Sequence, residues 1–88
     1  MKEINLTILT PDHNVFTGKV SRVQLPGSEG SFEILPGHAA LISTLDKGKI
    51  RYRLDNKDFF VESGSGVIEV SKDNVIVLVE AAVTNTAE

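Results

Sequence analysis

The chain is 88 residues long, 41% hydrophobic and free of cysteine, and its nine basic and twelve acidic residues give a formal net charge of −3. This length fits one domain with one core. The absence of cysteine excludes disulfide frameworks, thiolate zinc sites and cysteine nucleophiles, and it favours a reducing, cytosolic compartment. No basic run or long apolar segment occurs, so we expect neither nucleic acid as a partner nor a signal peptide or membrane span.

Alternating apolar residues predict strands from the first segment onward. The pattern recurs in INLTIL (residues 4–9), SRVQLP (residues 21–26) and KIRYRL (residues 49–54). A period of two indicates strands with one buried face. The positions expected to point inward are Ile4, Leu6, Ile8, Val23, Leu25, Ile50, Tyr52 and Leu54.

Two other apolar segments need separate interpretation. HAALISTL (residues 38–45) has some helical propensity, but a Pro-Gly pair precedes it and Asp-Lys-Gly follows it, so it is interpreted as strand or irregular structure. VIVLVEAAV (residues 75–83) is a nearly continuous run rich in β-branched residues. Such runs are typical of central strands, and we expect both faces of this one to be covered.

Turn-forming residues recur roughly every eight to twelve positions, which is the spacing of a β-sandwich or barrel. Two of these turns, DNK (residues 55–57) and KDN (residues 72–74), separate strand-like segments. Because Asp and Asn tolerate positive φ angles, both are predicted to be hairpin loops. The sequence therefore predicts a single all-β domain without a substantial helix.

Glycine-rich stretches do not match the motifs that bind phosphates. The pair Gly48-Lys49 is followed by Ile50, and Ser43 stands where the first glycine of a Walker motif belongs. Residues 64–66, Gly-Ser-Gly, begin like a dinucleotide fingerprint, but Glu69 occupies the position of the third glycine. We interpret these stretches as connections between strands.

Catalytic and metal-binding patterns are also incomplete. His13 and His38 lie in separate turns, and two histidines alone do not make a zinc site. The serines show no Gly-x-Ser-x-Gly elbow. Glu29 and Glu33 could form a carboxylate pair, but a chain with no Trp and one Tyr has few platforms for a sugar ring. No catalytic residue, cofactor or metal is predicted, which leaves a binding or assembly module.

The number of large apolar residues agrees with a binding role. Phe32, Phe59, Phe60, Ile42 and Val83 occupy more positions than one small core needs. Part of this surplus is expected to form an exposed patch that contacts a protein partner.

A longer series of motifs resembles a known family. The segments VQLPGSEGSFEILPGHAALIS, GKIRYR, SGSGVIEV and NVIVLVEAAV, preceded by LTILTPDHNVFTGKV, are similar to the N-terminal domain of the epsilon subunit of bacterial F-type ATP synthases. The resemblance covers about the first 84 residues. It implies a single ten-stranded β-sandwich of two antiparallel sheets over residues 1–84, with residues 85–88 as a frayed tail.

The family also implies a role. Its members are non-catalytic rotor subunits of the central stalk, without cofactors, that join the gamma subunit to the c ring and help couple proton or sodium flow to ATP synthesis. They work in a complex with alpha, beta and delta subunits, peripherally at the cytoplasmic face of the bacterial inner membrane. A free-standing sandwich that binds carbohydrate is the alternative interpretation.

Contact residues are transferred position by position. The resemblance implies c-ring contacts at Ser28, Glu29, Gly30 and Ser31, and gamma contacts at His38, Ala40, Ile42 and Ser43. Relatives often have an acidic residue where this chain has Ser31. Many relatives continue into a C-terminal helical hairpin that this sequence lacks, so inhibition and ATP sensing by that hairpin are not transferred. We expect a naturally short subunit rather than an excised domain.

Overall fold

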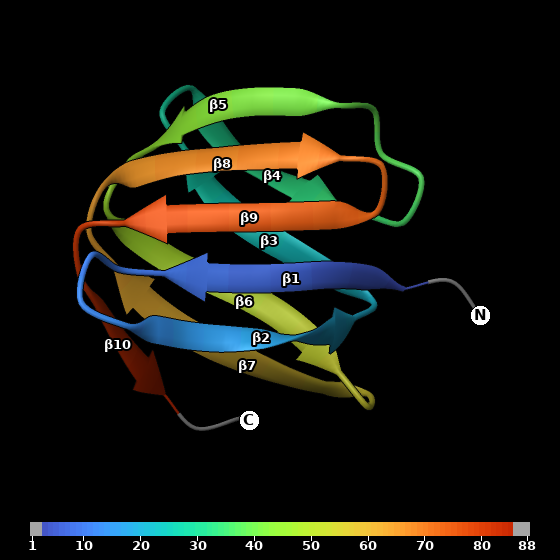
Figure 1. Ribbon diagram of the computed structural model, residues 1–88, viewed down its shortest axis with the longest axis horizontal. Coiled ribbons are helices and arrows are strands. Elements are labelled where there is room, and N and C mark those ends of the chain that lie inside the picture. The colour runs from blue at the N-terminus through green and yellow to red at the C-terminus, as the bar shows by residue number, and fades with distance from the viewer. Residues whose placement is uncertain (1–2, 86–88) are drawn as a thin grey trace.

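The computed structural model describes residues 3–85, which form ten strands and no helix (Figure 1). Nothing in this range could therefore cross a membrane as a helix. The strands are β1 (Ile4–Leu9), β2 (Asn14–Val20), β3 (Arg22–Gly27), β4 (Gly30–Ile34), β5 (Leu41–Leu45), β6 (Gly48–Leu54), β7 (Lys57–Ser63), β8 (Gly66–Ser71), β9 (Asn74–Val79) and β10 (Ala82–Asn85).

The strands pair in the order β10-β7-β6-β3-β5-β8-β9-β1-β2, and β4 pairs with β3 outside this path. The sheet folds over on itself into two layers, with β5, β8, β9, β1 and β2 in front and the other five strands behind (Figure 1). The layers join where Gly27 of β3 pairs with Leu45 of β5. The ten-stranded β-sandwich predicted from the sequence is confirmed.

One pairing departs from the expected antiparallel sheets. β1 lies between β2, its hairpin partner, and β9, to which it runs parallel from Asn5↔Asn74 to Leu9↔Leu78. A hairpin makes neighbouring strands antiparallel, whereas β1 and β9 are far apart in sequence and no short turn dictates their direction. The frayed tail was predicted for residues 85–88: Asn85 is the last residue of β10, and residues 86–88, like residues 1 and 2, lie outside the described range.

The core lies between the two layers and is built by the alternation seen in the sequence. All positions predicted to point inward are buried, except Leu54, which packs against the core while remaining partly exposed. Each fully buried aliphatic side chain contributes about 1.5–3 kcal/mol. At one side, the Tyr52 ring stacks with Phe59 and contacts Phe16, with centroid distances of 5.4 and 4.3 Å.

The predicted turns are present. Asp55 and Asn56 join β6 to β7 with φ angles of 54° and 65°, as expected for these residue types. In the β8–β9 turn the positive φ, of 57°, falls on Lys72 and not on the Asp or Asn from which the turn was predicted. Residues 38–40 are irregular and a strand begins at Leu41, so the interpretation of HAALISTL is also confirmed.

The prediction that both faces of the VIVLVEAAV strand are covered is wrong for this chain. In β9, Val75, Val77 and Val79 are buried in the core. The alternate residues Ile76 and Leu78 point outward and remain 45% and 44% exposed. The β-branched composition suits two covered faces, yet the fold covers only one, so the outer face of the front layer is left open.

Candidate functional site: two contact surfaces

The first surface is the turn between β3 and β4. Gly27 pairs with Gly30 at its base, and a Cβ on Gly27 would stand 2.6 Å from the carbonyl oxygen of Gly30. Gly30 has φ of 125°, which L side chains rarely adopt. The Ser28 amide donates to the Thr44 carbonyl oxygen at 3.3 Å, and the Thr44 hydroxyl donates to Ser28 Oγ at 2.8 Å. These bonds hold the turn against β5.

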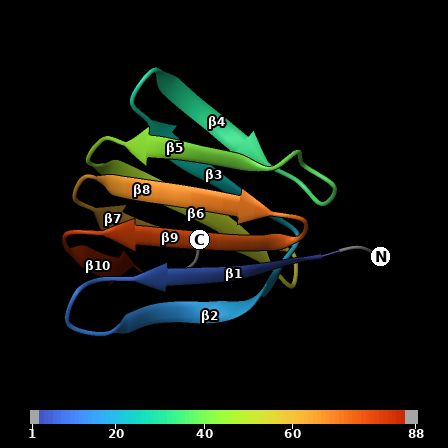
Figure 2. The same ribbon diagram turned by 45° about the horizontal axis from the view of Figure 1, so that its top comes forward.

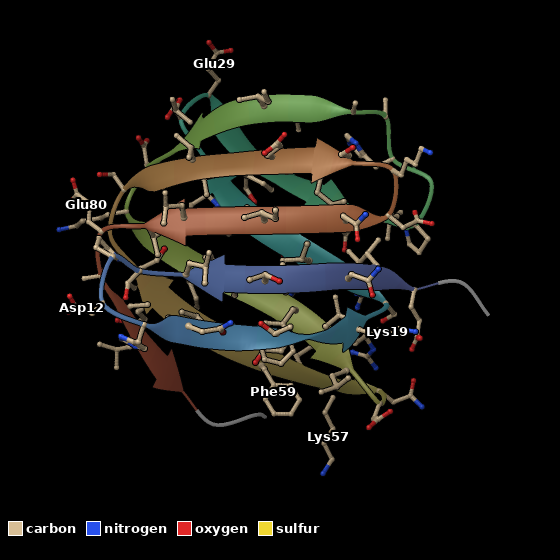
Figure 3. The ribbon with its side chains drawn as sticks, in the orientation of Figure 1. Asp12, Lys19, Glu29, Lys57, Phe59 and Glu80 are labelled. Carbon is tan, nitrogen blue, oxygen red and sulfur yellow. The ribbon has the colours of Figure 1, made fainter. Side chains whose placement is uncertain are left out.

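All four residues predicted to contact a c ring, Ser28, Glu29, Gly30 and Ser31, lie together in this turn and are exposed. Glu29 extends from its tip, away from the sandwich (Figure 3). Glu80 and Asp12, from other connections, lie on the left side of the view in Figure 3, well below Glu29. The turn therefore presents one exposed carboxylate, that of Glu29, on a backbone of constrained shape.

The second predicted set, for gamma contacts, is divided by the structure. His38 lies in the irregular segment before β5, where its ring Nδ1 donates to the Ala39 carbonyl oxygen at 2.7 Å, and Ala40 is exposed. Ile42 points outward from β5 and is 77% exposed. Ser43, the next residue, points to the opposite side of the strand. Ile42 and Ser43 therefore do not share a face.

Ile42 instead belongs to an exposed apolar patch, as predicted for part of the apolar surplus, but the other members of this patch were not among the residues named from the sequence. We call it the front face, and it comprises the outward aliphatic side chains Ile42, Val67, Ile76 and Leu78. They come from β5, β8 and β9, which lie side by side in Figures 1 and 2. The sequence did contain a signal for this patch, the apolar run at residues 75–79. The residues of that run that point outward were predicted to be covered.

A hollow of about 270 Å³ lies at one end of the front face. It occurs where β8 begins, β9 ends and the β1–β2 connection passes beside them, and most of its lining is apolar. Its lining residues are Pro11, Ser65, Gly66, Val67, Leu78, Val79 and Glu80. The hollow is a shallow, largely apolar depression next to the front face.

The polar residues considered for catalysis are dispersed. Glu33 pairs with Arg22 of the neighbouring strand at 3.6 Å, whereas Glu29 projects from the turn. His13 Nδ1 lies 3.2 Å from the Thr10 hydroxyl. Within residues 3–85, no three His, Asp or Glu side chains gather where a metal ion could bind.

Comparisons with known proteins agree with this architecture. Residues 3–85 match the family model described as "ATP synthase, Delta/Epsilon chain, beta-sandwich domain". An ATP synthase epsilon chain from Lawsonia intracellularis is 43% identical over 81 residues, which cover 92% of this chain and 61% of that protein. This chain thus spans about three fifths of the length of the curated relatives it matches.

Solved structures share the fold. A chain of the Euglena gracilis mitochondrial ATP synthase superposes with a TM-score of 0.88 at 21% identity, over 93% of this chain and 53% of that one. A chain in the central stalk and c-ring structure of the Tetrahymena thermophila mitochondrial enzyme superposes with a TM-score of 0.78 at 18% identity, over 93% and 66% of the two chains. Both likenesses concern the sandwich as a whole.

Proposed function

The chain belongs to the family of β-sandwich domains of ATP synthase delta and epsilon chains, and from this membership we propose that it acts as an epsilon-type rotor domain. In this role it joins the gamma subunit to the c ring in the central stalk and helps couple proton or sodium flow to ATP synthesis. It contributes contacts and no chemistry. It works within the complex that also contains alpha, beta and delta subunits, at the cytoplasmic face of the bacterial inner membrane.

The observation that carries this proposal is the open front face. Four aliphatic side chains from three neighbouring strands stand outward, 44% to 77% exposed, on a domain whose core is already complete. Contiguous exposed apolar surface of this kind is the usual mark of a protein partner. We assign it to the gamma subunit. Because the patch is aliphatic rather than aromatic, it does not suit the stacking of sugar rings.

The c ring is assigned to the end of the sandwich that carries the β3–β4 turn. The turn is supported by its bonds to Thr44 and by the Gln24 amide, which donates to Ser31 Oγ at 3.0 Å. Glu29 is free to meet a basic or amide group on the ring. One exposed ion pair contributes only about 0–1 kcal/mol, so several contacts along this end must act together.

The two surfaces lie on different parts of one stiff body. The front face covers the side of β5, β8 and β9, whereas the turn lies at the ends of the strands (Figure 1). A sandwich with a close-packed core deforms little under load. Torque from the ring can thus pass through the domain to gamma without being lost in local bending.

The experiment is binding of the chain to the purified gamma subunit of the same organism. Ile76→Lys replaces an apolar side chain in the middle of the front face and should abolish the complex, because the ammonium, even when it pairs with the neighbouring Glu69, would lose its water in the contact. The matched control is Glu62→Lys, at an exposed position of β7 in the back layer. Unchanged binding of Ile76→Lys would refute the assignment of this face.

The ring contact is tested in membranes that contain the whole synthase. Glu29→Lys should lower proton-driven ATP synthesis while leaving binding to gamma intact, because the turn lies outside the front face. Glu62→Lys, the same change of charge at an exposed position of the back layer, is the control. Normal coupling in Glu29→Lys would remove Glu29 from the proposed ring contact.

A further inference from the structure

Glu69 is an acidic residue set among the apolar side chains of the front face. It lies on β8, where its Cα partners are Ile42 of β5 and Ile76 of β9. Val67 precedes it by two positions on the same side of the strand. Opposed side chains in neighbouring strands have Cβ atoms about 4.5–5.5 Å apart, so exposed aliphatic groups adjoin the Glu69 side chain on three sides.

No ion pair or hydrogen bond engages the Glu69 carboxylate within the part of the chain that the structure describes. Lys19 is on β2, three strands away from β8, and Lys72, in the turn that follows β8, forms no ion pair with Glu69 among the described residues. In the isolated chain Glu69 is exposed, so water solvates its charge. That solvation is lost when a partner covers the surrounding aliphatic residues.

We propose that the partner surface which covers the front face carries an arginine or lysine directly opposite Glu69, within an otherwise apolar contact. This inference rests on the proposed function, because it takes the gamma subunit as the occupant of the face. A carboxylate enclosed among aliphatic groups is strongly unfavourable unless a cation and hydrogen bonds replace its water. An apolar patch with one central acid therefore selects an apolar partner with one matching base.

The aliphatic residues and Glu69 have different roles in recognising the partner. The aliphatic residues supply affinity through burial, and they would accept many apolar surfaces. Glu69 rejects those that lack a cation at the right position and fixes the rotational register of those that have one. The single charge thus makes Glu69 the specificity determinant of the face.

The test compares variants for binding to purified gamma subunit by isothermal titration calorimetry. Glu69→Leu removes the charge and extends the apolar patch. The inference expects binding to weaken about 30-fold or more, because the cation of gamma would be buried without its partner. Glu69→Gln, which keeps the size of the side chain, should weaken binding in the same direction. Glu62→Leu, an acidic-to-aliphatic change in the back layer, is the matched control and should alter affinity less than about twofold.

The direction of the change decides between explanations. If gamma presents only apolar groups at this point, Glu69→Leu will bind more tightly than the unmodified chain. Unchanged affinity would mean that the Glu69 side chain remains solvated at the edge of the contact. Either result overturns the inference. The Ile76→Lys variant shows whether only the cation opposite Glu69 is wrong or whether the assignment of the front face to gamma is wrong as well. Loss of binding in Ile76→Lys together with tighter binding of Glu69→Leu retains the face and removes the cation, whereas intact binding of Ile76→Lys removes both.

Discussion

Ile42 and Leu45 lie three residues apart on β5, and replacing each with alanine distinguishes the contact surface from the core. Ile42 points outward and is 77% exposed, whereas Leu45 points inward and is 2% exposed. Both substitutions remove three carbon atoms from the same strand. They therefore remove the same amount of apolar side chain while acting on opposite faces of the sheet.

The expected magnitudes follow from these exposures. Burial contributes about 0.8 kcal/mol per methylene. Covering the exposed three quarters of Ile42 would stabilise a complex by about 1.8 kcal/mol, so Ile42→Ala should raise the Kd for gamma about 20-fold. Its loss of folding stability should be only about 0.5 kcal/mol. Leu45→Ala leaves a cavity in a packed core and should destabilise the fold by about 2–5 kcal/mol, which lowers Tm by roughly 8 °C or more.

Thermal unfolding and calorimetric titration with gamma measure the two quantities on the same samples. The titrations are made well below the Tm of Leu45→Ala, so that both variants are folded. Under these conditions Leu45→Ala should bind gamma with nearly normal affinity. The reasoning is refuted if Ile42→Ala destabilises the fold as much as Leu45→Ala does, or if it binds gamma as tightly as the unmodified chain.

Three further predictions concern the turn, the core and pH. Gly27→Ala should destabilise the fold by about 1–3 kcal/mol in urea unfolding, because its Cβ would stand 2.7 Å from the Phe32 ring; a neutral result would mean that this contact relaxes freely. Val77→Thr keeps the shape of a fully buried side chain but adds a hydroxyl, and it should cost about 1–3 kcal/mol, whereas Ile76→Thr on the open face should cost less than half as much by the same assay. Burial raises the pKa of Tyr52, the one tyrosine of the chain, so the unfolded state ionises first and the stability of the fold should decrease as pH rises above about 10. Ultraviolet titration of tyrosinate follows this group, and Tyr52→Phe should lose this part of the pH dependence.

Much of the fold could be predicted because its strands have simple local signals. Alternation in INLTIL and KIRYRL identified the buried faces of β1 and β6, and the Asp-Asn and Lys-Asp pairs identified two hairpin turns. These signals are local, since side-chain direction alternates along any strand and turn residues act through their own φ angles. The parallel pairing of β1 with β9 has no such signal, because it joins segments about 70 residues apart.

The two contact surfaces also differ in how far they could be predicted from the sequence. The four residues of the β3–β4 turn are consecutive, so the sequence alone could group them. The front face combines Ile42, Val67, Ile76 and Leu78 from three strands, and only the sheet order brings them together. Ile42 could be predicted from the sequence as a contact residue, but only in one set with Ser43, which points to the other side of β5.

The amino-acid sequence by itself determined an all-β domain, strands such as β1, β3, β6 and β9 and their inward positions, because these depend on periodicity and on the conformational preferences of single residues. The number of ten strands was implied by the resemblance to the epsilon family. Tertiary structure decided which apolar residues remain outside. The run VIVLVEAAV reads as a strand in either case, but hydrophobicity does not tell whether its second face is covered by the same chain or by another one. Only the curling of the sheet into two layers exposes Ile76 and Leu78, and it places Glu69 among them as an isolated charge.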